Sequence, residues 1–431
     1  MPAFIRSLIP VLVVLSACEK KGDTGVSEEE GIPDPGDAIV VETSRGPIFS
    51  EYMDFGVSPG LVGVPNIDDD DRDGRIDWDQ EGQAMGDNDY ALGSFVTHGR
   101  AVALTLRGSG VRIYQGTTLL LDEINNTTEI QGDIDFRVEY DAFLAQAELI
   151  VQDLDRADEF NVMLTASPLF LNHHLQPAEE TMALVIRGGD GWDNTEFVDG
   201  YEQVLGNDFI GIPGSRYDYD PWVQDEFEFG YATSPDAHLD VIFDTHRNGQ
   251  GAPGDGLDDF PENAYLDPDW VVVNWGRVQA NSLDYGGNLE VSPPVTVDGV
   301  DYPYGRIYYG GAPDYLPQPA TRNALDDMEV QKPFMADSTW LCVGHIDEFT
   351  TTIPDPSAPK GFRFVISDTE SAWELLESMN PSTSLPRYAP GGWNGHSIDS
   401  VGEIVNDRSL RNLNEEVQEI LDAEKERFMD E

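Results

Sequence analysis

Four oxygen-bearing side chains lie within five consecutive positions of this sequence, flanked by aromatic residues. They belong to the stretch WVQDEFEFGY at 222–231, whose composition is typical of a β-strand. Successive side chains of a strand point to opposite faces, so Asp225 is expected to face one side. The other side then carries Gln224, Glu226 and Glu228. Such oxygen donors bind hard cations such as Ca²⁺, which leaves Asp225 free for a positively charged substrate.

A second acidic stretch, at 69–77, has the spacing D-x-D-x-D-G-x-x-D. Oxygen side chains at alternate positions, followed by a glycine for a sharp turn, are typical of calcium loops. The expected ligands are Asp69, Asp71, Asp73 and Asp77. The twelfth position is Gln80 rather than a bidentate glutamate, so the stretch is not a standard EF-hand. A solvated acidic loop is the alternative interpretation.

The acidic net charge limits the kinds of molecule that this protein is expected to bind. The 431 residues include 81 acidic and 25 basic side chains, for a formal net charge of −56. A nucleic-acid-binding protein needs a basic surface, which this composition argues against. An excess of carboxylates suits calcium, cationic substrates or a salt-rich medium, although most of these groups are expected to be solvated. The apolar fraction of 40% still predicts a folded core.

The N-terminus reads as a targeting segment. Arg6 precedes a short apolar run at 8–14, too short to cross a bilayer. Residues 15–18, LSAC, resemble the bacterial lipoprotein cleavage box, which implies a signal peptide at 1–17, a lipidated Cys18 and a lipid-anchored location in the cell envelope. An ordinary secretory signal is the alternative. Residues 18–40 then read as a flexible linker, and a lipidated Cys18 leaves Cys342 without a disulfide partner.

Two regions with different predicted secondary structure follow the linker, and together they predict an α+β chain. Short strands such as 102–106 and 136–140, separated by turn residues, predict an antiparallel sandwich over 41–166. From 167 onward, apolar strands alternate with helical stretches. The helical stretches are expected at 321–328, 371–379 and 409–428. The last has Leu410, Leu413, Val417, Ile420 and Leu421 at helical spacing.

Three further clusters extend the pattern of the first stretch. They read VIFDTHRN at 241–248, SLDYGGNLEVSPPV at 282–295 and WLCVGHIDEF at 340–349. In this order, the four stretches closely resemble the peptidyl-arginine deiminases, from about residue 171 to about 422. Residues 43–166 look like the middle, immunoglobulin-like domain of that family. The resemblance implies an immunoglobulin-like β-sandwich, then an incomplete α/β-propeller (pentein-like) catalytic domain at 167–431.

The resemblance also implies an activity, namely calcium-dependent hydrolysis of arginine residues in proteins or peptides to citrulline with release of ammonia. Asp225 and Asp347 would bind the substrate guanidinium, and His345 would be the general acid and base. Trp222 would line the slot for the aliphatic stem, and Arg247 would lie near the substrate backbone. The family has a second arginine two positions after Arg247, where this sequence has glycine, so backbone recognition stays open.

The same resemblance implies two calcium sites in the catalytic domain. One would use the side chains of Gln224, Glu228 and Glu290 with the backbone carbonyls of Gly286 and Leu289. The other would use Glu226, Asp244, Thr245 and Asn248. The strand alternation described above independently places three of these side chains on one face.

The sequence departs from the family at the nucleophile. The family uses a cysteine in a His-Cys-Gly-Thr stretch, which does not occur in these 431 residues. Cys342 is expected to be a small buried apolar residue rather than a replacement. The chain is therefore expected to be inactive alone, through a truncated or frameshifted reading frame, a segment supplied by a second chain, or degeneration. The alternatives are a non-catalytic, calcium-dependent arginine-peptide-binding surface lipoprotein and a plain calcium-stabilised surface module.

Overall fold

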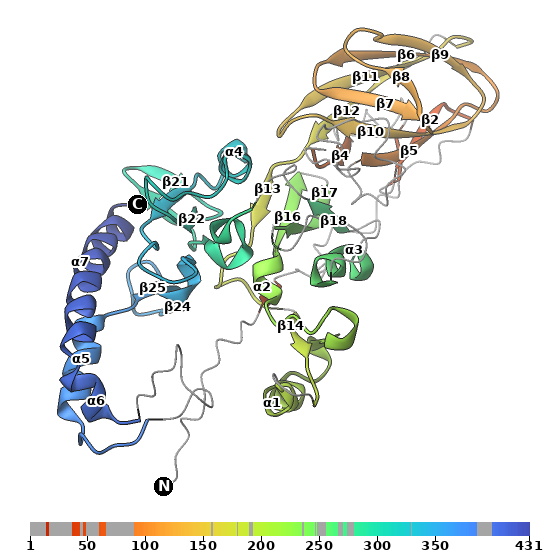
Figure 1. Cartoon of the computed structure of the whole chain (residues 1–431). Coiled ribbons are helices and arrows are strands. Elements are labelled where there is room, and N and C mark those ends of the chain that lie inside the picture. Colours follow the sequence, from red (N-terminus) through yellow and green to blue (C-terminus); the bar gives the residue numbers. More distant parts are fainter. Residues whose placement is uncertain are drawn as a thin grey trace.

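The structure is a computed structural model with a mixed α/β fold, many strands and few helices (Figure 1). It describes residues 14–16, 37–43, 46–48, 60–65, 90–156, 158–178, 180–188, 193–234, 237–245, 247, 256–265, 270–273, 280–328, 330–385 and 399–431. Cys18, Asn248 and the acidic stretch at 69–77 lie outside the described residues. None of the helices in the described part is long and apolar enough to span a membrane.

Two sheets make up the first part of the chain. One has the order β3-β2-β5-β10-β7-β8 and the other β4-β12-β11-β6-β9. The strands of the first are β2 (Val40–Thr43), β3 (Gly46–Ile48), β5 (Tyr90–Val96), β7 (Val111–Gln115), β8 (Thr118–Leu121) and β10 (Ile134–Tyr140). Those of the second are β4 (Gly60–Gly63), β6 (Ala101–Gly108), β9 (Thr127–Gln131), β11 (Gln146–Asp153) and β12 (Glu159–Ala166). Pairing is antiparallel throughout, except that β4 runs parallel to β12.

The alternation of side chains gives these two sheets one shared core. In β6, Val102, Leu104 and Leu106 are buried while the residues between them are partly exposed. They belong to the same apolar cluster as Phe95 and Ile113 from the other sheet. The two sheets therefore pack face to face as a sandwich, which agrees with the expectation of a strand-rich first part.

The remaining chain forms small sheets rather than one large one. Strands β13 (Leu169–Leu171), β16 (Phe227–Ser234), β17 (Ala237–Asp244) and β18 (Trp270–Val273) form one sheet in that order. Strands β1 (Val14–Ser16), β14 (Glu180–Val185) and β15 (Phe209–Pro213) form another. Helices α1 (Thr195–Leu205) and α3 (Phe260–Ala264) belong to this part, and Phe260 packs with Phe227 in an apolar cluster. These sheets carry the acidic stretch near 222–228.

The C-terminal part contributes three more small sheets and most of the helices. Strands β19 (Leu289–Val291), β22 (Ile307–Gly310) and β23 (Phe334–Ala336) form one sheet, and the pairs β20 (Val295–Val297) with β21 (Val300–Tyr302) and β24 (Thr350–Pro354) with β25 (Phe362–Ile366) form the others. The helices are α4 (Pro319–Asp327), α5 (Thr369–Ser378), α6 (Val401–Asn406) and α7 (Arg408–Asp430). Helices α4, α5 and α7 confirm the helical stretches expected from the sequence.

Helix α7 runs along one side of the C-terminal part (Figure 1). Val417 and Leu421 are buried against Tyr308, Ile346 and Phe349. The predicted apolar face is wrong at Leu413, which is 53% exposed. Glu424 instead lies on the buried face with Val417 and Leu421. The helix thus supports the segment around residues 346–349, which leads into β24.

We expect Leu421→Ala to lower the free energy of unfolding of the C-terminal part by about 2–4 kcal/mol, because it leaves a cavity beneath α7. Leu413→Ala, on the exposed side of the same helix, should change it by less than about 0.5 kcal/mol. Urea unfolding followed by circular dichroism measures both. Equal effects of the two variants would contradict the packing described for α7.

Candidate active site

The stretch at 222–228 begins as a helix, so the prediction of a continuous strand is wrong there. Residues Val223–Glu226 form one helical turn, α2, and β16 starts at Phe227. The physical reason lies outside the stretch. The Thr245 hydroxyl is 2.6 Å from the Asp225 carbonyl and its backbone N–H donates to the Glu226 carbonyl. Thr245 therefore satisfies carbonyls at the end of this turn that a strand would have paired in a sheet.

The helical turn changes which side chains share a face. Gln224 and Glu228 line one pocket, whereas Glu226 is fully buried and contacts Arg247. Asp225 points elsewhere, toward His345. The expected separation of Asp225 from Gln224 and Glu228 is therefore present, but Glu226 does not accompany those two residues.

Asp225 and His345 form the centre of the site. His345 Nδ1 is 3.3 Å from Asp225 Oδ1, and His345 Nε2 is 2.7 Å from the Ser282 carbonyl. Burial lowers the pKa of His345, but the hydrogen bond and the charge of Asp225, together with Asp347, outweigh it and leave the pKa raised. Because a carbonyl only accepts, Nε2 carries a hydrogen, and Nδ1 is the nitrogen that faces Asp225.

Gly287, in the 3₁₀ turn η7 (Gly286–Asn288), shows how closely the three predicted catalytic side chains approach one another. A Cβ atom at Gly287 would lie 2.7 Å from Asp225 Oδ1, 2.7 Å from His345 Nδ1 and 3.1 Å from Asp347 Oδ2. A side chain at this position would push these three groups apart. Asp225, His345 and Asp347 therefore converge on one point, beside the backbone of Gly287.

Asn288 fixes this backbone from below. Its Nδ2 donates to the carbonyls of Leu283 and Gly310, at 2.8 and 3.0 Å. Its Oδ1 accepts from the N–H groups of Gly310 and Ile346, at 2.8 and 3.1 Å. Asn288 is fully buried, so these bonds are shielded from water. They join η7 to β22 and to the turn η8 (Ile346–Glu348), which carries Asp347.

Asp347 lies among other acids. Burial raises its pKa to about 8, with further contributions from Glu290 and Asp225, while His345 acts in the opposite direction. Without a cation, this carboxyl group is therefore partly protonated near neutral pH. A positively charged group bound beside it would restore the carboxylate.

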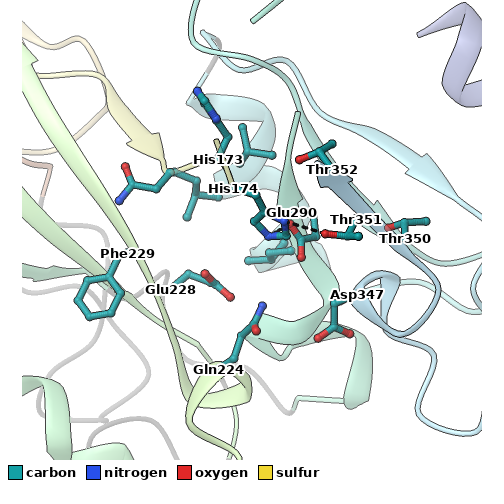
Figure 2. Close-up of a pocket in the computed structure, with 14 residues that line it drawn as sticks. His173, His174, Gln224, Glu228, Phe229, Glu290, Asp347, Thr350, Thr351 and Thr352 are labelled. Carbon is teal, nitrogen blue, oxygen red and sulfur yellow. Dashed lines mark hydrogen bonds and ion pairs between the residues drawn. The ribbon is translucent and has the colours of Figure 1, made fainter. Parts of the chain in front are cut away.

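A pocket of about 300 Å³ opens beside Asp347, and Figure 2 shows the residues that line it. Glu228 and Gln224 point into it from the β16 side, and Glu290 from β19. The Oε1 atom of Glu228 is buried without a hydrogen-bond partner. Burial, and then the charge of Glu290, raise the pKa of Glu228 well above its usual range. The pocket therefore brings several acidic oxygens together, and one of them, Glu228 Oε1, has no hydrogen-bond partner.

These residues fit a hard cation by donor type. Gln224, Glu228 and Glu290 offer oxygen atoms, and Gly286 packs directly on the Gln224 carbonyl, where a Cβ atom would approach to 2.0 Å. The orphaned Glu228 oxygen is the feature that a cation would satisfy. Within the described part of the chain, however, no three His, Cys, Asp or Glu side chains are grouped closely enough to hold a metal ion. Amide and backbone oxygens, including that of Leu289, would have to complete the set.

The residues predicted for a second calcium site are divided among other contacts. Glu226, Asp244 and Thr245 are all buried. Burial raises the pKa of Glu226 to about 8, although Arg247 opposes the shift. The Arg247 guanidinium pairs with Glu226 and lies 2.8 Å from Asp220 Oδ2. In this structure Arg247, predicted to lie near the substrate, thus occupies the neighbourhood of Glu226.

Trp222 and Cys342 are both exposed. Trp222 is 40% exposed, at the start of α2, and its role beside the substrate stays a prediction. Cys342 is exposed, so the expectation of a buried apolar residue is wrong. Its loop turns outward because the following residues, at 344–346, take the buried positions. The sequence did not single out Ser282, Asn288 or His174 as site residues. Only His174 had a visible signal, because it follows another histidine, His173.

The family model described as "Protein-arginine deiminase (PAD)" matches residues 157–431. The chain belongs to the protein-arginine deiminase family. This result confirms the resemblance inferred from the four sequence clusters.

Curated relatives agree with this assignment. Human protein-arginine deiminase type-1 is 34% identical over 268 residues, covering 59% of this chain and 39% of the relative. Human type-4 is 30% identical over 276 residues, covering 62% and 40%. Mouse type-1 is 35% identical over 226 residues, covering 50% and 33%. The chain thus spans two-fifths or less of the length of these relatives.

The raised pKa of Asp347 predicts a pH-dependent stability in calcium-free buffer. A carboxyl group with a folded-state pKa of about 8 binds a proton that the unfolded chain has already released above pH 4. Stability from this group is therefore full below the unfolded pKa and is lost as pH rises through about 8. We expect Asp347→Asn to reduce the fall in the free energy of unfolding between pH 5 and 9 by on the order of 3 kcal/mol, which appears as a flatter dependence of the melting temperature on pH.

The matched control is Asp314→Asn, which removes one exposed carboxylate of the same type. Its melting temperature should follow that of the parent chain across the whole pH range. Parallel curves for Asp347→Asn and the parent would show that Asp347 is ordinarily ionised in the folded chain.

Proposed function

We propose that this site binds the guanidinium group of peptidyl-arginine and serves its calcium-dependent deimination to peptidyl-citrulline. The observation that carries the proposal is the convergence of Asp225, His345 and Asp347 above Gly287. The family assignment and the names of the relatives support the same reaction.

The geometry suits this substrate for electrostatic reasons. A guanidinium is planar and presents paired N–H donors, which two carboxylates on either side can accept. One such contact at about 4 Å is worth roughly 4 kcal/mol at an effective dielectric of about 20, before desolvation. Asp347 gains most, because a bound cation would oppose the rise in its pKa that burial, and then its acidic neighbours, cause.

Deimination replaces one guanidine nitrogen by the oxygen of water, and the nitrogen leaves as ammonia. In the proposed role, His345 supplies the proton that the leaving nitrogen needs and later takes one from water. Nδ1 is the nitrogen that gives and takes this proton, because Nε2 keeps its own hydrogen and donates it to the Ser282 carbonyl. Asp225 orients the ring and stabilises its charged form.

The remaining chemical requirement is a nucleophile for the guanidine carbon, which the family resemblance implies is a thiolate. Among the described residues the one cysteine is Cys342, which is exposed in the loop before His345. Because Cys342 does not stand in the family's His-Cys-Gly-Thr stretch, we keep a second candidate function, in which this chain binds arginine peptides in a calcium-dependent way without turning them over.

Calcium in the proposed site would be held by Gln224, Glu228 and Glu290, with the backbone carbonyls of Gly286 and Leu289. Bound there, it would neutralise the two glutamates beside Asp347 and draw β16 and β19 together. The orphaned oxygen of Glu228 supports this role. We extend the proposal to a second site at Glu226, Asp244, Thr245 and Asn248 and to the stretch with Asp69, Asp71, Asp73 and Asp77.

The wider organisation is part of the same proposal. We infer an immunoglobulin-like domain at 41–166, which the two-sheet core supports, and a pentein-like catalytic domain at 167–431, supported by its succession of small sheets. The lipoprotein-like LSAC box supports a lipid anchor at Cys18 and a location in the bacterial cell envelope. Arginine-containing proteins or peptides would be the partners there.

Calorimetric titration with benzoyl-arginine amide, in excess calcium, tests arginine binding. We expect Asp225→Asn and Asp347→Asn each to weaken binding at least about thirtyfold, because each removes a charge-assisted contact. Asp314→Asn, which removes an exposed acid, should bind as the parent does. Binding that is unchanged in both site variants would overturn the proposed site.

A colour assay for citrulline, with and without calcium, separates the two candidate functions. We expect this 431-residue chain to bind the arginine compound but to form citrulline only at the background level. Loss of a covalent nucleophile lowers turnover on the order of a millionfold. Calcium-dependent citrulline formation that disappears in Asp225→Asn would instead establish the chain as a deiminase. Citrulline formation that survives this variant would contradict the assigned site.

A further inference from the structure

His174 contacts a proposed calcium ligand directly. It follows β13 and lies in the pocket, where its Nε2 is 2.7 Å from Glu290 Oε2 and its Nδ1 is 3.1 Å from Thr351 Oγ1 (Figure 2). The Glu290 side chain is 4% exposed and that of His174 is 33% exposed. The imidazole thus reaches from the pocket mouth to a buried carboxylate.

The direction of this hydrogen bond decides what His174 can do. An ionised carboxylate only accepts, so Nε2 carries the hydrogen and its lone pair is not available to a metal. His174 is therefore bound to Glu290 as a hydrogen-bond donor, and Thr351 holds the other side of its ring.

We propose that His174 is an internal competitor of calcium: it occupies Glu290 in the metal-free chain and must be displaced before calcium binds there. The inference rests on the proposed calcium role of the pocket. Calcium binds carboxylate oxygens at about 2.3–2.6 Å, so an N–H group at hydrogen-bond distance from Oε2 takes a position that the ion needs. This role belongs to a side chain outside the proposed set of calcium ligands.

The two glutamates of the pocket differ in this respect. One oxygen of Glu290 already accepts a hydrogen bond from His174, so calcium gains less from it. Glu228 keeps a buried oxygen without a hydrogen-bond partner. Calcium is therefore attracted mainly by Glu228, and the strength of the His174–Glu290 pair sets how readily the second glutamate joins.

His173 provides a matched control within the same pocket. It is the adjacent residue and the same chemical type, but its Nδ1 accepts a hydrogen bond from the backbone N–H of Leu175, at 3.2 Å. Its ring is thus engaged in a local turn rather than with Glu290. Replacing His173 removes an imidazole from the pocket wall and leaves the His174–Glu290 pair intact.

Calcium binding at one fixed pH, in about 0.15 M salt to screen the diffuse acidic surface, tests the proposal by calorimetry. The component of binding that disappears in Glu290→Gln identifies the pocket. For this component we expect His174→Ala to bind calcium about tenfold more tightly than the parent chain. His173→Ala should bind as the parent does.

Thr351→Val gives a second, milder variant, because it removes the other partner of the imidazole and keeps His174 in place. It should strengthen calcium binding about threefold. Circular dichroism and the melting temperature in calcium-free buffer establish that each variant is folded, and the affinities are compared among folded variants.

The outcomes separate this inference from the proposed function. If Glu290→Gln leaves calcium binding unchanged, the calcium role of the pocket fails and the inference fails with it. If binding depends on Glu290 but is unchanged in His174→Ala and Thr351→Val, the calcium role stands and competition by His174 is overturned. Weaker binding in His174→Ala would overturn it as well, because the imidazole would then assist the ion.

Discussion

Repulsion between carboxylates that lie wholly or partly out of water is the interaction on which this structure depends. Burial, and then the charges of Glu290 and Asp225, raise the pKa of Glu228 and of Asp347. Such repulsion is costly away from water unless basic groups lie nearby. The chain supplies three basic side chains, since His174 pairs with Glu290, His345 with Asp225 and Arg247 with Glu226. In the metal-free fold, basic side chains offset the charge of these carboxylates. Arginine and calcium would offset the same charge in the proposed complexes.

Short, irregular segments position these charges, and buried polar side chains hold those segments in place. Asp284 accepts hydrogen bonds from the backbone N–H groups of Asn281 and Gln318 and from the Thr321 hydroxyl. Gln331 binds both backbone groups of Leu171 and thereby continues the edge of β13 without another strand. Such contacts replace the regular ladder that a long sheet would provide. They allow the acids to approach from three separate segments of the chain.

The sequence predicted the parts of this chain that local pattern controls. Helix α7 follows from apolar spacing, helices α4 and α5 match helical stretches expected between strands, and β6 matches the strand expected at 102–106. The family resemblance named Asp225, His345 and Asp347, which do lie together. Local pattern failed at α2, because the contacts of Thr245, about twenty residues away, favour a helical turn. It also failed at Cys342 and gave no reason to single out His174, since both depend on which neighbours the fold brings near.

Asn288 uses all of its hydrogen-bonding capacity, two donors and two acceptors, on backbone groups of three different segments. An aspartate of the same shape would turn oxygens toward two carbonyls, and a leucine would leave four polar groups unsatisfied. Substitution of Asn288 is therefore destabilising, even in a chain that no longer needs to catalyse anything. A descendant that lost its chemistry would keep the asparagine for as long as it kept the fold, so retention of this residue is a poor marker of surviving activity.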